Sequence, residues 1–344
     1  MRLDQSIIAG LSELGDVPGY LKDVVRAGVV STIDTQMIID DNDYVAVEQG
    51  KPIPDEARTS FGPIEERIER TQQTIVAEGF SNGNFHTLVR DFGSLLFGMI
   101  ASAAQQAEVA SWHESRIAQF GGFLMADAGG SSIQQWNTVF TSDGEMLTLD
   151  VDKVWIIEGH RLDYGSVASA STQKLYPTSI LVPPDEFAKL KKTPIGAPFL
   201  DGALQLGNVS GRVTVPKSRM LSGGGLASTS VFLSKARPRF VRALMAHLRW
   251  LDTCGKITLS PQQREAAQAL EAIATAYYHG LVARKPSLPM ALALKFTSNR
   301  LLLDVVASGS AIDPAIQRDL MAFTRMEGSS YRCLFEIYSK VKVR

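Results

Sequence analysis

The sequence predicts an α+β fold that is mostly helical, with a middle antiparallel β domain between two helical domains. Apolar residues recur at helical spacing in the first 120 residues, whereas short alternating runs and turn signals dominate residues 133–216. After the glycine run at 222–225, helical spacing and helix-capping residues return. We therefore expect an N-terminal helical domain over residues 1–120, a middle β domain over 121–225 and a C-terminal helical bundle over 226–344.

The composition is that of an ordinary globular chain. It has 344 residues, 45% of them hydrophobic and 21% charged, and 35 basic against 36 acidic residues. A net charge of −1 gives no field that would attract nucleic acid or an anionic membrane. We find no secretory signal, and the apolar run at 92–104 is too short to span a bilayer. The expected location is the cytoplasm.

The two cysteines, Cys254 and Cys333, have no metal-binding spacing. A disulfide between them is one alternative, and two buried thiols in a reducing compartment are the other, which we favour. The five histidines also lack metal-ligand spacing, so no metal site is expected. His160, which follows Glu158 and Gly159, is the histidine of most interest.

In the N-terminal domain, residues 65–77 carry charge on one face and isoleucines on the other, which predicts an amphipathic helix. Residues 86–110 are small and apolar without proline, and they predict a single core helix. The polar stretches 40–43 and 52–55 predict loops.

In the middle domain, two apolar runs flank Asp143-Gly144, a tight-turn signal that predicts a β-hairpin. Further strands are expected over 154–157, 179–182 and 209–215, and the basic run 189–192 is expected in a solvated loop. In the C-terminal domain, Ser260-Pro261-Gln262-Gln263 is a capping box that predicts a helix start, and Asp313-Pro314 predicts another.

Five segments, in order along residues 120–344, resemble motifs of the acyl-CoA dehydrogenase family. They are Leu124 to Ser132, Lys153 to Ile156, Val215 to Lys217 with Leu221, Lys235 to Pro238, and Arg318-Asp319 followed by Met326 to Ser330. The residues before 120 are similar to the family in helical character only.

The resemblance implies bound FAD and a catalytic carboxylate. Glu327 matches the base that removes the α-proton of an acyl thioester, and flavin N5 would accept the hydride from Cβ. The matching cofactor-binding positions are Leu124, Met125, Trp155, Ile157, Arg237 and Gly328. Ser131 and Gly328 match substrate-binding positions. The expected partners are an acyl-CoA or acyl carrier protein and further copies of the chain, as a homodimer or homotetramer.

Several side chains depart from the family's pattern. Met125 and Ile157 replace two threonines near the flavin ring, and Asp252 replaces an arginine that would reach the FAD pyrophosphate. Residues 305–309 lack a glutamine and one glycine. We therefore expect FAD affinity below that of typical family members.

Simpler interpretations stay open for each candidate. Glu327 is otherwise an ordinary loop carboxylate, Trp155 a buried strand aromatic and residues 129–132 a turn. Asp127 and Glu158 are the alternative carboxylates if Glu327 is not the base. The prediction is an FAD-dependent dehydrogenase acting on a CoA-bound or carrier-bound acyl thioester. The alternatives are a non-catalytic member of the fold and a flavin monooxygenase.

Overall fold

The computed structural model describes residues 64–130, 132–174, 176–281, 288–327, 333 and 336. The predicted loops at 40–43 and 52–55 and the residues Ser131 and Gly328 lie outside this part of the chain. Two compact units are present. Among the described residues, the helical unit contains 72–80 and residues from 233 onward, and the β unit contains 64–71 and 81–232. The α+β, mostly helical fold is confirmed.

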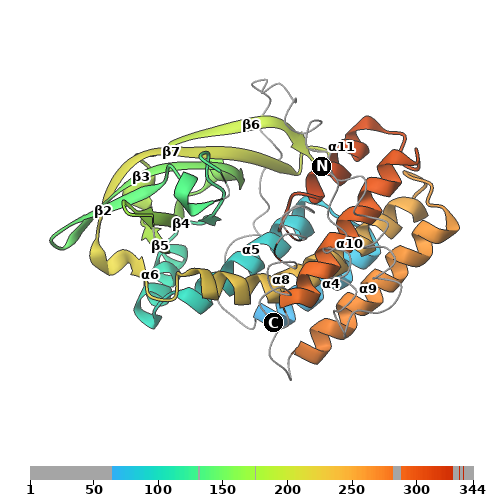
Figure 1. The fold of residues 1–344 in the computed structure, drawn as a ribbon, viewed down its shortest axis with the longest axis horizontal. Helices are drawn as coiled ribbons and strands as arrows, with labels where there is room; N and C mark the ends of the chain where they lie inside the picture. The colour runs from blue at the N-terminus through green and yellow to red at the C-terminus, as the bar shows by residue number, and fades with distance from the viewer. Residues whose placement is uncertain are drawn as a thin grey trace. The chain divides into compact units, whose positions relative to one another are not determined.

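The β unit is built on one sheet, in which β6, β7, β3 and β2 lie side by side (Figure 1). The strand order is β6-β7-β3-β2-β4-β5-β8, with β1 paired to β4. The strands are β1 Gly121–Leu124, β2 Val139–Asp143, β3 Met146–Ile157, β4 Tyr164–Ser171, β5 Pro177–Val182, β6 Lys191–Phe199, β7 Leu204–Pro216 and β8 Met220–Leu221.

The strands pair mainly in antiparallel fashion, as predicted, with two parallel exceptions. The pairs β1–β4 and β2–β4 are parallel. Both parallel pairs involve β4. This strand is followed directly by its antiparallel partner β5, whereas other elements separate it in sequence from β1 and β2. The predicted Asp-Gly turn joins β2 to β3, with Gly144 at φ 56°.

Alternation along β3 builds the core of the β unit. Leu147, Leu149 and Val151 point to one buried face, where they meet alternating valines of the antiparallel neighbour β7. The buried valines of β7 are Val209, Val213 and Val215. This long pairing fixes the register of β3, the strand that carries Trp155.

Two sequence expectations in the β unit are wrong. Residues 86–110 form two helices, α5 Asn82–Ile100 and α6 Ala103–Glu114, because Ser102 and Gln105 cap a new helix reciprocally. Residues 189–192 are not all loop, since Lys191 begins β6 after the short helix α7 Pro184–Phe187. The ammonium of Lys192 donates to the carbonyl of Leu162, and this contact holds it against the sheet.

The helical unit is formed mainly by α8 Leu226–Thr253, α9 Pro261–Leu281, α10 Leu288–Ala307 and α11 Pro314–Phe323, with the end of α4 Ile64–Glu78. The two predicted starts are confirmed. Ser260 and Gln263 make the capping box of α9, and Asp313 accepts a hydrogen bond from Ala315 at the start of α11. Helix α10 packs against both α9 and α11 (Figure 1).

The cysteines are free thiols. Cys333 is buried as expected, but Cys254 is exposed, because it follows the end of α8 in the turn that leads to α9. Among the described residues, no helix is long and apolar enough to cross a bilayer. The same residues hold no cluster of His, Cys, Asp or Glu suited to a metal ion.

Candidate functional site

Three candidate residues, in two different units, have left-handed backbone although they are not glycine. Seven described non-glycine residues have positive φ, and four of them are not among the candidate residues: Arg116, Lys174, Leu200 and Asp201. The other three are Trp155 at φ 59°, Glu158 at 51° and Glu327 at 57°. A bulky residue in this region is strained, and such strain persists only where the surroundings enforce it, often at functional sites.

Trp155 sits at a break in the sheet. The register of β3 with β7 shifts between Lys153 and Ile156, so Trp155 lies in a β-bulge. Its side chain is 40% exposed, although Lys153 and Ile156 are buried. The bulge therefore exposes a large aromatic surface next to the buried residues Lys153 and Ile156.

The loop after β1 is attached to the strand that carries Trp155. The amide of Val154 donates to the backbone carbonyl of Ala126, and the amide of Ala128 donates to the backbone carbonyl of Asp152, both at 3.1 Å. Asp127 and Lys153 form an isolated bridge between these segments. The predicted flavin-facing loop and strand are thus adjacent through backbone hydrogen bonds, which do not depend on side-chain type.

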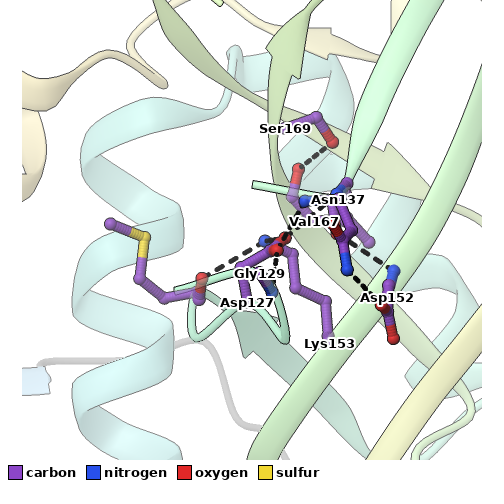
Figure 2. A network of polar contacts seen from close by, with 9 residues as sticks. Asp127, Gly129, Asn137, Asp152, Lys153, Val167 and Ser169 are labelled. Carbon is purple, nitrogen blue, oxygen red and sulfur yellow. Dashed lines mark hydrogen bonds and ion pairs between the residues drawn. The ribbon is translucent and has the colours of Figure 1, made fainter. Parts of the chain in front are cut away.

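Figure 2 shows the buried carboxylate of Asp127 at the centre of this attachment. It accepts hydrogen bonds from the amides of Gly129 at 3.0 Å, Asn137 at 2.7 Å and Thr138 at 3.1 Å. The ammonium of Lys153 lies 3.1 Å from Asp127 Oδ2 and also donates to the carbonyl of Met125. The Asp127 carboxylate therefore holds the loop after β1 against β3 and against the segment at Asn137 and Thr138.

Burial shifts the pKa values of Asp127 and Lys153 in opposite directions. Burial raises the pKa of Asp127, but the hydrogen bonds and Lys153 outweigh it and hold that pKa below its ordinary value. Burial lowers the pKa of Lys153 to about 8, although Asp127 and Asp152 oppose the shift. The ring of Trp136, 4.5 Å from the ammonium, closes the site on one side.

The other cofactor-binding candidates of the β unit differ in what they present. The side chain of Leu124 is fully buried in the core, so only its backbone is available to a ligand. Met125 is partly buried against the cluster around Trp136. Ile157 is half-buried at the end of β3, opposite Leu206.

Next to Ile157, a buried titratable cluster surrounds Glu158. Glu158 Oε1 accepts from the amide of Gln205 at 2.7 Å, while Oε2 lies 3.5 Å from Arg161 and 3.9 Å from His160. His86 from α5 lies 3.8 Å from Oε1. Glu158 Oε2 and both ring nitrogens of His160 make no hydrogen bond within the described part of the chain.

Burial dominates the titration of this cluster. It raises the pKa of Glu158 to about 7, against the opposing effects of the Gln205 hydrogen bond and Arg161. Burial and, to a smaller extent, the charge of Arg161 lower the pKa of His160 to about 4. Near neutral pH the imidazole is therefore uncharged and the carboxyl is divided between its two forms.

Glu327 follows the last turn of α11 and is half-buried. Burial raises the pKa of its carboxyl, and the positive charges of Arg237 and Lys295 oppose the shift. The guanidinium of Arg237 donates from Nε to the Glu327 carbonyl at 2.7 Å. Arg237 Nη1 is buried without a hydrogen bond in the described residues, and the nearest carboxylate oxygen, on Glu336, is 3.9 Å away.

Asp252, the residue that the sequence resemblance matches to an arginine, has a local role in the structure. Its carboxylate pairs with Arg264 at 2.8 Å and accepts from the amide of Leu259 at 3.0 Å. The Arg264 hydrogen bond holds the pKa of Asp252 below its usual range. This acid stabilises the turn between α8 and α9 and supplies no positive charge.

Sequence reasoning missed two buried lysines that organise these segments. Lys153 falls on the buried face of the alternation that begins at Leu147, a pattern that predicts a buried cation in need of a partner. Lys295 stands in the apolar run 290–296 of α10 and is fully buried. In both cases the partner lies far along the sequence, and only the fold identifies it.

Comparison with known proteins adds evidence at the level of structure. No family profile and no curated protein matches the sequence. The chain is similar to the structure of FkbI, for biosynthesis of the methoxymalonyl extender unit of the Fk520 polyketide, with a TM-score of 0.64 and 14% identity over 100% of both chains. It is also similar to glutaryl-CoA dehydrogenase from Mycobacterium smegmatis, with a TM-score of 0.60 and 15% identity over 99% of this chain and 94% of that one.

A third similar structure is butyryl-CoA dehydrogenase from Megasphaera elsdenii, with a TM-score of 0.59 and 12% identity, covering 96% of this chain and 99% of that chain. One structure of the Mycobacterium smegmatis glutaryl-CoA dehydrogenase contains FADH2. At such low identities the likeness concerns the fold and not the chemistry. The chain has the acyl-CoA dehydrogenase fold.

Proposed function

We propose that this protein is an FAD-dependent dehydrogenase that removes the Cα and Cβ hydrogens of an acyl thioester, with Glu327 as the α-proton base. The observation that carries the proposal is the state of Glu327. It combines a left-handed backbone, a carboxyl whose pKa is raised by burial and the position of the base in the family motif.

The residues of the β unit fit a flavin ring. Trp155 exposes 40% of its surface from a bulge, and the loop 124–128 is bonded directly to the same strand. Trp155, Ile157 and the backbone of Leu124 and Met125 would hold the ring, and Arg237 and Gly328 are the proposed contacts of the C-terminal segment. FAD, when bound, supplies an acceptor for the hydride that leaves Cβ.

Glu327 would take the α-proton. A thioester α-proton is weakly acidic, so a carboxylate made more basic by burial is a better acceptor. Arg237 and Lys295 oppose that shift and so favour an ionised carboxylate that is ready to accept a proton. Hydrogen bonds to the thioester carbonyl would stabilise the developing enolate, and the Glu327–Gly328 backbone is the proposed donor.

The proposed substrate is bound to CoA or to an acyl carrier protein, with Ser131 and Gly328 on the substrate side. We propose a homodimer or homotetramer as the assembled form.

Two measurements test the function. The first is titration of the apo-protein with FAD, for which we expect binding weaker than is usual in this fold. An arginine at position 252 would make a charged hydrogen bond to the FAD pyrophosphate, and its absence costs about 1.5–3 kcal/mol, or roughly ten- to hundredfold in affinity. The second is bleaching of the bound flavin without oxygen by a panel of CoA and carrier-protein thioesters.

The Glu327→Gln variant separates the base from the fold. It should bind FAD like the wild type but bleach about 10²–10⁴-fold more slowly, because the positioned base is absent. Glu265→Gln, at an exposed position on α9, is the matched control and should bleach at the wild-type rate. Equal bleaching rates for Glu327→Gln and Glu265→Gln would remove Glu327 from the mechanism and leave Glu158 as the next carboxylate to test.

A second candidate function is a non-catalytic member of the fold. The ion pair of Asp252 with Arg264 favours it, because an acid with a structural partner stands at the position that the resemblance matches to a flavin-phosphate contact. Absence of FAD binding at high micromolar concentrations would support this candidate and reject the dehydrogenase.

A further inference from the structure

Side chains of α10 reach the end of the helix that leads to Glu327. The ammonium of Lys295 donates to the carbonyl of Phe323, the last residue of α11, at 2.8 Å. It also donates to Asn299 Oδ1 at 2.6 Å, and Asn299 Nδ2 donates to the carbonyl of Thr324 at 3.0 Å. The final carbonyls of a helix have no partner within that helix, so these two side chains supply what α11 lacks.

The contact between Arg237 and the Glu327 carbonyl completes the set. The segment from Phe323 to Glu327 is therefore held at three carbonyls by side chains from two other helices, α8 and α10. A non-glycine residue with φ 57° is costly and keeps that conformation only when its neighbours enforce it. These three donors provide that constraint.

A buried lysine contributes little to the free energy of unfolding, because removing its charge from water is costly. Lys295 and Asn299 are fully buried, and the ammonium lies 5.1 Å from the centre of the Phe240 ring. Burial lowers the pKa of Lys295 to about 7, opposed by Cys333 and Glu327 and reinforced by Arg237. An apolar side chain of similar volume is often equally or more stabilising at such a site, so the lysine calls for another explanation.

We propose that Lys295 and Asn299 are positioning residues that hold the Phe323–Glu327 segment, and through it the Glu327 carboxylate, in one orientation. The meaning of this role for catalysis rests on the proposed function, but the physical claim concerns only the order of the segment. It predicts that removal of either side chain loosens residues 323–327 without unfolding the helical unit.

The first test is amide hydrogen exchange of the peptide covering residues 320–327 in Lys295→Met and Asn299→Ala. Each variant should exchange about tenfold faster there, since each loses at least one hydrogen bond that closes the segment. Thr297→Val is the matched control, because Thr297 is buried on the same helix but donates within it, to Ala293. Exchange in both variants at the Thr297→Val rate would overturn the proposal. If Lys295→Met does not fold, Asn299→Ala decides alone.

The second test applies if the wild type oxidises a thioester. Positioning predicts that kcat falls about 10- to 100-fold in both variants while KM and FAD binding stay near wild type. The pKa of the base in the pH–rate profile should also rise in Lys295→Met. The positive charge of Lys295, which counteracts the rise in the Glu327 pKa caused by burial, is then gone. An unchanged kcat overturns the proposal. Faster exchange with an inactive wild type supports the positioning role and rejects the proposed function instead.

Discussion

Replacing Glu158 by Gln should change how the stability of the β unit depends on pH. Glu158 has an ordinary pKa of 4.5 in the unfolded chain and about 7 when folded, because burial penalises its charged form. The folded state therefore binds the proton more tightly. Its contribution to stability is complete below pH 4.5 and is lost as pH rises through 7.

The size of the effect follows from the difference between the two pKa values. The folded pKa of about 7 lies well above the ordinary value of 4.5, and this difference corresponds to about 3 kcal/mol of stability. Glutamine keeps an oxygen that accepts the hydrogen bond from the Gln205 amide but cannot ionise. The free energy of unfolding of the variant should thus gain about 3 kcal/mol relative to the wild type between pH 4.5 and pH 8.

The assay is urea unfolding followed by tryptophan fluorescence at several pH values. Three of the four tryptophans, Trp112, Trp136 and Trp155, lie in the β unit, so a Trp250→Phe background restricts the signal to it. The neutral histidines His86 and His160 have lowered pKa values and add a rise in stability with pH, in wild type and variant alike. The difference between the two proteins therefore isolates Glu158.

Parallel pH profiles for the two proteins would refute the reasoning. They would mean that the carboxyl titrates in the folded protein as it does in the unfolded chain, and that burial does not govern it.

Two further predictions concern the attachment of the 124–132 loop. Asp127→Asn removes the ion-pair partner of the buried Lys153 and should lower the free energy of unfolding by about 3–5 kcal/mol, whereas adding Lys153→Met should restore most of it. A double variant no more stable than Asp127→Asn would contradict this account. Gly129→Ala would place a Cβ 1.9 Å from the carbonyl of Gln135 and should lower the free energy of unfolding by about 1–3 kcal/mol, measured by thermal or urea unfolding. Gly98→Ala on α5, where the added Cβ meets nothing within 4 Å, should instead raise it by up to about 1 kcal/mol, because alanine favours helix.

The sequence by itself determined the elements whose signals are local. The capping box at Ser260, the Asp313-Pro314 start and the Asp-Gly hairpin each depend on residues within a few positions of one another. The order of helical, β and helical segments and the position of Glu327 in a family-like motif also come from sequence alone. The break at Ser102 was equally local, but its capping box lay hidden inside a long apolar run.

Only the tertiary structure decided which distant groups meet. Lys153 and Asp127 are a buried pair, and Glu158 lies beside His86 of another element, because the sheet and α5 bring those segments together. The exposure of Trp155 depends on a β-bulge that the alternating pattern of apolar residues in β3 does not predict. Lys295 and Asn299 reach the carbonyls before Glu327 because α10 packs against α11. Periodicity encodes which face of an element is buried, whereas the partner of a buried charge is set by packing between elements.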